Sequence, residues 1–261
     1  MSISPRLSVV IPALNEEGRL PATLDSVREY LGDRKDLLPA EILVVDDGSK
    51  DRTAELVRET GMIASVETRC LRHLRTRGKG AAVRTGFSAS RGELVLISDA
   101  DLSAPIDQLE ILLRELDDRS IAIGSRAVDR SLIVHSQPLY RDLMGRSFNM
   151  LVRALLLPDI GDTQCGFKLF PGALARALSA VAGIDGFAWD VEYLCLARHW
   201  AFEIRELGVQ WAHVEASRVL PGRHSWQMFR DVLRLAGRRF GRGFPEKPGK
   251  FFVAEGVGHD A

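Results

Sequence analysis

Two aspartates separated by one small residue are the part of this sequence best suited to chemistry. Asp99 and Asp101, with Ala100 between them, follow the apolar run 94–97. The β-branched residues of this run, and Gly92 before it, favour a buried parallel strand. Carboxylates just past the end of such a strand suit a Mg²⁺ or Mn²⁺ ion that also contacts the phosphates of a ligand. Taken alone, an Asp-x-Asp pair is also common in solvated loops and at helix N-termini.

Two other predicted strands, 7–11 and 41–45, also run into polar residues. These residues are Asn15, Glu16, Asp46 and Asp47. The carboxyl ends of parallel strands meet at one edge of a sheet, and ligands bind at that edge. Three polar strand ends together therefore indicate a nucleotide pocket, in which carboxylates accept hydrogen bonds from a base or from ribose hydroxyls.

A basic loop precedes the strand that carries the aspartates. Lys79 stands between Gly78 and Gly80 at the start of the predicted helix 81–90. Its ammonium group and the neighbouring backbone N–H groups are placed to meet a phosphate. On the local sequence alone, an exposed lysine in a flexible loop is an equal alternative. A Walker A spacing is absent, and no Gly-x-Gly-x-x-Gly follows the first strand, so the ATPase and dehydrogenase classes lose support.

The order of elements and the composition predict the fold class. Strands and helices alternate through the first hundred residues, which indicates an α/β fold with a parallel sheet and right-handed crossovers. The chain has 261 residues, 46% of them hydrophobic, which is enough for one globular domain with a core. Lys plus Arg and Asp plus Glu number 35 each, so the net charge does not favour nucleic acid as a partner.

The C-terminal segment 226–261 is basic and ends in a tail. Trp226, Phe229, Leu233 and Phe240 recur at roughly helical spacing beside several arginines, as in a helix that lies in a membrane interface. A helix that packs on the domain with a basic outer face is an equal alternative. No apolar run approaches the ~20 residues of a membrane span, and three scattered cysteines favour reduced thiols. We therefore expect a cytoplasmic protein that touches the cytoplasmic membrane face at most peripherally.

These motifs and their order resemble the GT-A glycosyltransferases of family 2. The nucleotide-binding half, about 1–102, carries the resemblance in residues 7–17, 41–53, 77–86 and 93–101. The acceptor half, about 103–225, resembles the dolichyl- or polyprenyl-phosphate sugar synthases, and among them the dolichyl-phosphate β-glucosyltransferases. Its matching stretches are Gly124-Ser125-Arg126, Pro138-x-x-Arg141, Asp162 to Lys168 and Trp189-Asp190-Val191-Glu192. The resemblance implies a single GT-A domain over 1–225, with a Rossmann-like, mostly parallel sheet flanked by helices.

The resemblance also implies an activity. It is the inverting, metal-dependent transfer of a hexose from a nucleotide sugar to a polyprenyl or dolichyl phosphate. UDP-glucose is mildly favoured over GDP-mannose, because Ser103 stands where mannosyl-phosphate synthases often have a metal-binding Gln. The expected nucleotide-sugar contacts are Pro12, Asn15, Glu16, Asp46, Asp47, Lys79, Asp99 and Ala100, and the expected ligands of Mg²⁺ or Mn²⁺ are Asp101 and Asp99.

The middle of the chain supplies the expected site for the acceptor phosphate. The family spacing points to Arg126 and Arg141, and Lys168 is a further candidate behind Gly166. Guanidinium groups bind phosphate through two parallel hydrogen bonds, which an ammonium group cannot do. We therefore expect these three cations to contact the acceptor and not the nucleotide.

The expected catalytic residues are Asp99, Asp101, Asp190 and Lys79. A phosphate oxygen is anionic near neutral pH, so its attack on the anomeric carbon needs no strong base. The metal on Asp101 and the charge of Lys79 would stabilise the departing diphosphate. The family places Asp190 and Glu192 near the donor sugar and acceptor, although Asp is also common at a helix N-terminus.

Two alternative functions stay open on the sequence. One is a same-fold glycosyltransferase with a soluble hydroxyl acceptor, for which Asp190 or Glu192 would be the general base. The lack of a membrane span keeps this alternative open. The other is a non-catalytic module that binds nucleotide sugars, which the presence of Asp99, Asp101, Lys79 and Asp190 disfavours.

Overall fold

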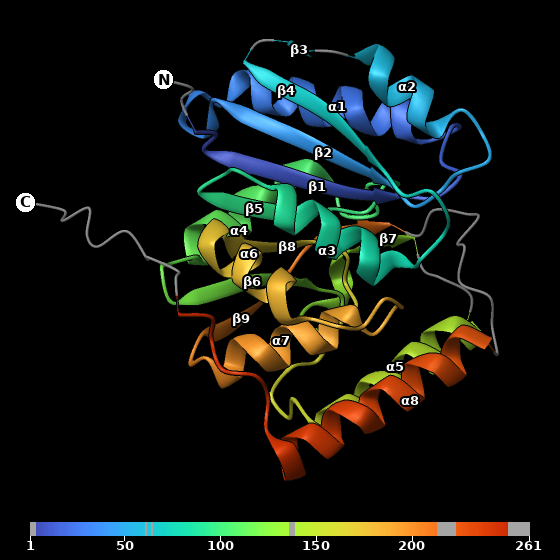
Figure 1. The fold of residues 1–261 in the computed structure, drawn as a ribbon, viewed down its shortest axis with the longest axis vertical. Helices are drawn as coiled ribbons and strands as arrows, with labels where there is room; N and C mark the ends of the chain where they lie inside the picture. Colours follow the sequence, from blue (N-terminus) through green and yellow to red (C-terminus); the bar gives the residue numbers. More distant parts are fainter. Residues whose placement is uncertain (1–3, 61, 64, 136–138, 213–222, 250–261) are drawn as a thin grey trace, which may run out of the picture.

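The computed structural model describes residues 4–60, 62–63, 65–135, 139–212 and 223–249 (Figure 1). The strands are β1 Leu7–Ala13, β2 Ala40–Asp46, β3 Met62–Ile63, β4 Val66–Arg72, β5 Leu94–Ile97, β6 Ser120–Ser125, β7 Ile133–His135, β8 Lys168–Pro171, β9 Glu203–Gly208 and β10 Trp211–Ala212. The α-helices are α1 Leu20–Asp33, α2 Thr53–Thr60, α3 Lys79–Ala89, α4 Leu109–Glu115, α5 Leu139–Leu155, α6 Gly172–Val181, α7 Trp189–His199 and α8 Arg223–Gly237. A π-helical turn, Arg238–Arg242, continues α8.

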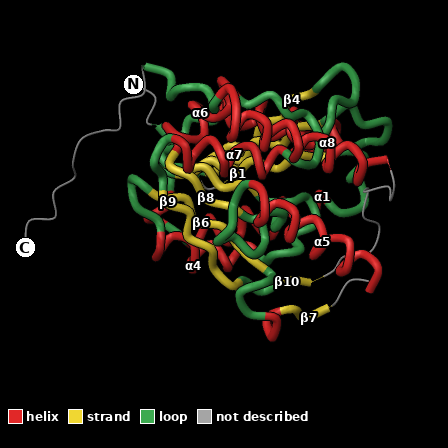
Figure 2. Tube along the Cα trace, turned by 90° about the horizontal axis from the view of Figure 1, so that it is seen from below, coloured by secondary structure: helices red, strands yellow, loops and turns green. Residues whose placement is uncertain are grey.

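One sheet forms the centre, with the strand order β3-β4-β2-β1-β5-β8-β6-β9. The pairs β1–β2, β1–β5, β2–β4 and β6–β9 are parallel, whereas β3 and β8 run antiparallel to their neighbours. The predicted α/β fold with a mostly parallel sheet is therefore confirmed. A second sheet pairs β7 with β10 and lies apart from the main one (Figure 2).

Helices cover both faces of the main sheet. On one face α1 and α2 share a core cluster with the apolar side chains of β1 and β2, and α4 packs on β6, β8 and β9. On the other face α3 packs on β1 and β2, α6 on β5 and β8, and α7 on β9. The helix α1, with Pro21 in its first turn, buries Leu24, Val27 and Leu31. The short edge strand β3 pairs antiparallel with the longer β4.

The sheet topology brings three of the predicted polar strand ends together. Ala13 pairs with Asp46 at the ends of β1 and β2, and Val10 pairs with Ile97 at the end of β5. The residues that follow these strands thus lie at one carboxyl edge, which is where α/β sheets bind ligands. The antiparallel β8 lies between β5 and β6, and brings Gly166 and Lys168 to the same region.

Candidate active site

Asp99 lies just past the end of β5 and forms an ion pair with Lys79. The distance from Lys79 Nζ to Asp99 Oδ1 is 2.5 Å. Burial disfavours both charges, but the attraction between them outweighs it, so the pKa of Lys79 is raised and the pKa of Asp99 is lowered. A Cβ on Gly166 would lie 2.1 Å from Asp99 Oδ2, so only glycine fits beside this carboxylate.

Asp101 is held by the loop that follows it. Its Oδ1 accepts hydrogen bonds from Ser103 N at 3.0 Å and from Ser103 Oγ at 2.9 Å. Leu102, with a φ of 46°, makes the left-handed turn that brings Ser103 back to the carboxylate. Asp101 Oδ2 lies 3.9 Å from Arg19 Nη1. The carboxylate is therefore oriented through one oxygen, and its side chain is partly exposed.

The oxygen donors present fit a divalent cation that is shared with a ligand. Among the described residues, no cluster of three or more His, Cys, Asp or Glu side chains could hold a metal ion. Mg²⁺ is commonly bound through one or two carboxylates, with substrate phosphates and water completing its shell. Asp101 and Asp99 can supply these carboxylates at the edge of the sheet. The metal site itself stays a prediction.

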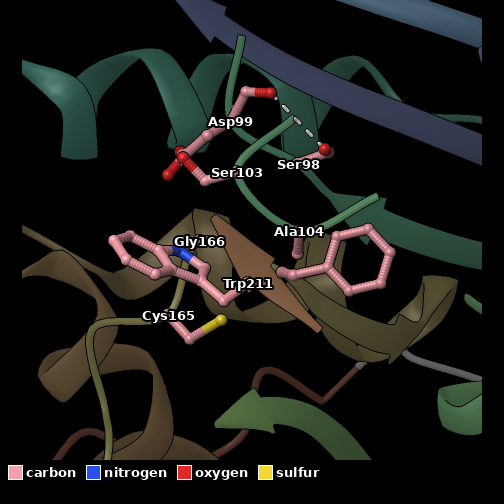
Figure 3. A pocket seen from close by; sticks show the side chains of 8 residues that line it. Ser98, Asp99, Ser103, Ala104, Cys165, Gly166 and Trp211 are labelled. Atoms are coloured by element: carbon pink, nitrogen blue, oxygen red, sulfur yellow. Dashed lines mark hydrogen bonds between the residues drawn. The ribbon is translucent and has the colours of Figure 1, made fainter. Parts of the chain in front are cut away.

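A small hollow lies next to Asp99 (Figure 3). It is lined by Ser98, Asp99, Ser103, Ala104, Cys165, Gly166, Phe167 and Trp211. Asp99 and Ser103 face Trp211 and Cys165 across it. Trp211 is fixed in place because Ala212 N donates to Ser103 O at 2.8 Å, and the Arg126 guanidinium lies over its ring at 5.2 Å. The hollow thus has a carboxylate on one side and an aromatic ring on the other.

Asp47 fixes the loop that presents Lys79. Its carboxylate accepts from the backbone N–H of Arg77 at 3.0 Å and of Gly78 at 2.8 Å. His73 Nδ1 lies 2.7 Å from Asp47 Oδ1, and His73 Nε2 lies 2.9 Å from Thr85 Oγ1 on α3. The sequence analysis missed His73, because no spacing signal links a lone histidine to residues on two other elements. A role of Asp47 in nucleotide binding stays a prediction.

The remaining expected donor residues connect the strand ends to one another. Asn15 Oδ1 accepts from Lys50 N at 2.8 Å, and Asp46 Oδ1 accepts from Ser49 N at 2.8 Å. Glu16 binds Arg19 through both carboxylate oxygens. The first of these bonds joins the loops after β1 and β2, and the other two stabilise each loop within itself.

Pro12 and Ala100 have no polar side chain, and the contacts that place them at the site are made by their backbone. Pro12 lies in β1 opposite Val45 of β2. The Ala100 carbonyl accepts from Thr23 Oγ1 at 2.7 Å, which ties the Asp99–Asp101 turn to α1. Contact of either residue with a nucleotide sugar stays a prediction.

Of the acceptor candidates, Arg126 already has a protein partner. Its Nε lies 2.6 Å from Asp162 Oδ2 and its Nη2 lies 2.9 Å from Asp162 Oδ1, a bidentate pair. Asp162 is buried, yet the charge of Arg126 holds the pKa of this carboxyl well below its usual range. Arg126 still lies close enough to Asp99 to help lower the pKa of that carboxyl.

The two other acceptor candidates differ in their surroundings. Lys168 is fully buried; its Nζ donates to the Cys165 carbonyl and lies 5.5 Å from the centre of the Trp189 ring. Its charge also acts on Asp99. Arg141 belongs to α5, but its side chain lies outside the part of the structure that is described. Contact of Arg126, Arg141 and Lys168 with an acceptor stays a prediction.

Asp190 and Glu192 begin α7 but have different environments. Asp190 Oδ1 accepts from Val191 N at 2.7 Å. Burial raises the pKa of Asp190 to about 6, although the nearby Lys168 and Lys79 act in the opposite direction. Glu192 instead accepts from two backbone N–H groups, those of residues 183 and 184, and lies 3.2 Å from an arginine at position 238. Asp190 thus interacts electrostatically with two cations of the site, Lys168 and Lys79.

Asp190→Asn is expected to raise the free energy of unfolding at pH 7 and to change it little near pH 4. The folded pKa of about 6 lies above the ordinary 3.8, so the folded state holds a proton that the unfolded state loses. Stability therefore falls as the pH rises from about 4 to about 6, by roughly 3 kcal/mol in all. Asn cannot ionise, but its Oδ1 still accepts from Val191 N. Urea unfolding of both proteins at several pH values checks this, and a pH-independent difference would contradict it.

Comparison with known proteins places the chain in a family. Residues 8–176 match the family model described as glycosyl transferase family 2. The chain therefore belongs to this family, as the motifs of the sequence predicted, and it is a glycosyltransferase.

Two relatives show which branch of the family the chain is similar to. It is 37% identical over 243 residues to the dolichyl-phosphate beta-glucosyltransferase of Homo sapiens, covering 89% of this chain and 75% of that protein. It is 38% identical over 245 residues to the protein of the same name in Dictyostelium discoideum, covering 89% and 74%.

Solved structures support the fold assignment. A glucosyl-3-phosphoglycerate synthase from Mycobacterium tuberculosis, in complex with Mg²⁺ and UDP, aligns with a TM-score of 0.64 at 21% identity, covering 93% of this chain and 81% of that one. A mannosyltransferase from Pyrobaculum calidifontis, in complex with GDP-Man and Mn²⁺, aligns with a TM-score of 0.55 at 20% identity, covering 89% and 65%. At these identities the likeness is one of fold.

Proposed function

We propose that this glycosyltransferase transfers glucose from UDP-glucose to a dolichyl or other polyprenyl phosphate. The observation that carries the proposal is the arrangement around one small hollow. Asp99 lines this hollow and Asp101 stands two residues further along the same loop, and the cations Lys79, Arg126 and Lys168 are close enough to Asp99 to affect its pKa. A transfer between a diphosphate and a phosphate needs both signs of charge beside the sugar. The similarity to dolichyl-phosphate beta-glucosyltransferases supports this choice of donor and acceptor.

The donor half of the proposal rests on Asp101, Asp99 and Lys79. A Mg²⁺ or Mn²⁺ ion held by Asp101, with help from Asp99, would offset the charge of the departing diphosphate. Lys79 begins α3 directly after the loop that Asp47 holds at two backbone N–H groups, so its ammonium would be kept beside the phosphates. The hollow between Asp99 and Trp211 lies beside these groups, and the indole ring forms its far side.

On the acceptor side, a phosphate oxygen forms the new bond to the anomeric carbon while the bond from that carbon to the diphosphate breaks. The attacking oxygen is already anionic, so no residue has to remove a proton from it. Arg126 uses Nε and Nη2 to bind Asp162, which leaves Nη1 as its donor toward the acceptor phosphate. The Asp162 pair thereby orients the guanidinium before the acceptor arrives.

Transfer of radiolabelled glucose tests the proposal. The purified protein is given UDP-glucose or GDP-mannose, with Mg²⁺ or Mn²⁺, and polyprenyl phosphate in detergent. We expect label from UDP-glucose to enter the organic phase in the presence of the acceptor. Label that enters only a water-soluble product would favour the soluble-acceptor alternative. Binding of UDP-glucose without transfer to any acceptor would favour the non-catalytic module.

A lipid acceptor implies work at a membrane surface. In the described part of the chain, none of the helices has both the length and the apolar composition needed to cross a bilayer. We therefore propose peripheral contact with the cytoplasmic membrane face through the C-terminal segment 226–261. Within the described part of this segment, α8, which begins at residue 223, buries Val232 and Leu235 in the main core.

A further inference from the structure

Exposed apolar side chains gather on two helices of the molecule. Eleven large hydrophobic side chains are exposed in the described residues, and eight of them belong to α5, to α8 or to the π-helical turn that continues α8. On α5 they are Tyr140, Leu143, Met144 and Met150; on α8 and its continuation they are Trp226, Phe229, Leu233 and Phe240. Exposed patches of this kind mark sites that contact a protein or a membrane.

The helix α8 has two apolar faces, of which the domain uses one. Val232 and Leu235 are buried in the core. On the outer side Trp226 is 68% exposed and Leu233 is 46% exposed, and the ring of Trp226 stacks on that of Phe229 at 5.8 Å. A helix on the surface of a soluble domain normally turns polar residues outward. The inner face of α8 thus packs on the domain, whereas its outer face is suited to an apolar neighbour.

The helix α5 shows the same arrangement beside α8. Val152 near its end is buried in the core, whereas Leu143 and Met150 are each 68% exposed. The two helices contact each other and lie side by side (Figure 1). In the chain, α5 follows β7 and α8 follows β10, the two strands of the small sheet, and Trp211 of β10 lines the hollow. In sequence, the helix pair thus follows the small sheet that contributes Trp211 to the hollow.

Among the side chains described on the pair, the exposed charges are positive. The exposed arginines are Arg146 and Arg153 on α5 and Arg230 and Arg234 on α8. Arg238 and Arg239, on the continuation of α8, are also exposed but bind Glu192 and the carbonyls of residues 155 and 156. The acidic side chain described on these helices, Asp231, is buried. Arginines bordering an apolar stripe are typical of a helix that lies in an anionic membrane surface, to which each basic residue near the surface is attracted. Two copies of the chain that met through this face would instead oppose arginine to arginine.

We propose that α5 and α8 form one docking surface for an anionic lipid bilayer. The apolar side chains would enter the interface between headgroups and acyl chains, and the arginines would contact the headgroup phosphates. Docking through α5 goes beyond contact by the C-terminal segment, because it makes half of the surface part of the catalytic domain. The proposal rests on the proposed function in one respect, namely that the acceptor phosphate is presented at such a surface.

Vesicle sedimentation tests the surface directly. The protein is mixed with vesicles of phosphatidylcholine alone or with phosphatidylglycerol added, and bound protein is measured. We expect binding to the anionic vesicles, and a loss of at least roughly tenfold in affinity for either of two double variants. One variant is L143E with M150E on α5, and the other is W226E with L233E on α8. The matched control is L74E, which adds charge at an exposed leucine outside the helix pair, and thermal unfolding verifies that all variants fold.

The α5 variant decides whether the surface includes both helices. Binding by the α5 variant equal to that of the wild type would overturn the two-helix surface, and so would wild-type protein that binds neither vesicle. A wild-type dimer that both double variants convert to monomer, without vesicle binding, would assign the surface to a second copy.

Transfer assays keep this proposal separate from the proposed function. With farnesyl phosphate free in solution, the double variants should transfer glucose at the wild-type rate, whereas with a long polyprenyl phosphate in anionic vesicles they should be at least roughly tenfold slower. Equal rates for variant and wild type on the vesicle-borne acceptor would overturn the docking surface. Wild-type protein that binds vesicles but glycosylates neither acceptor would overturn the proposed function and leave docking intact.

Discussion

Asp101→Asn is expected to lower turnover by roughly 10²–10³-fold while the protein stays folded. Asn has nearly the size of Asp, and its Oδ1 can still accept from Ser103 N and Oγ, the bonds that orient the side chain in the wild type. The variant loses only the negative charge, which is what a divalent cation needs from this position. Because Arg19 Nη1 is 3.9 Å from the other oxygen, the loss of charge disturbs no close ion pair.

The measurement is glucose transfer over a range of Mn²⁺ concentrations, together with calorimetric binding of UDP. We expect Asp101→Asn to need much more Mn²⁺ and to lose the metal-dependent part of its UDP affinity. Asp25→Asn is the matched control, since it removes the same charge from an exposed site on α1. Near-normal turnover in Asp101→Asn, or full wild-type activity in excess EDTA, would remove the metal role of this residue.

The nucleotide-binding half could be predicted from the sequence because its elements are regular. Apolar runs of strand length alternate with periodic helices, so the parallel order follows, and with it the shared edge for Asp47 and Asp99. The observed pairing of Ala13 with Asp46 and of Val10 with Ile97 agrees with this. Local spacing is sufficient to predict this shared edge, because each of the two aspartates follows closely on its own strand.

The partners of the site residues could not be predicted in the same way. Asp162 lies 36 residues from Arg126, and Asp99 lies far in sequence from the Gly166 that leaves room for it. These contacts depend on where the short antiparallel β8 enters the sheet, between β5 and β6. A four-residue strand has little periodicity of its own, so its position is set by tertiary packing and not by a local pattern.

The ion pair between Arg126 and Asp162 means that a mutation at Arg126 changes the stability of the protein as well as any contact with the acceptor. Arg126→Ala is expected to lower the free energy of unfolding by roughly 3–5 kcal/mol, because Asp162 then keeps a buried charge without its cation. The Asp162 side chain is 3% exposed, and its remaining bonds are to the backbone N–H groups of residues 126 and 164. At roughly 2–4 °C per kcal/mol, the melting temperature should fall by about 6–20 °C.

The double variant Arg126→Ala with Asp162→Asn separates stability from acceptor binding. Removing the buried charge should restore much of the lost stability, whereas two independent losses would simply add. With the fold restored, the role of Arg126 can be measured against Asp162→Asn alone. We expect the KM for farnesyl phosphate to rise and the KM for UDP-glucose to stay nearly constant. An unchanged acceptor KM would make Arg126 only the partner of Asp162. A rise in the KM for UDP-glucose alone would assign Arg126 to the donor site, because its guanidinium would then act on the leaving diphosphate and not on the incoming phosphate.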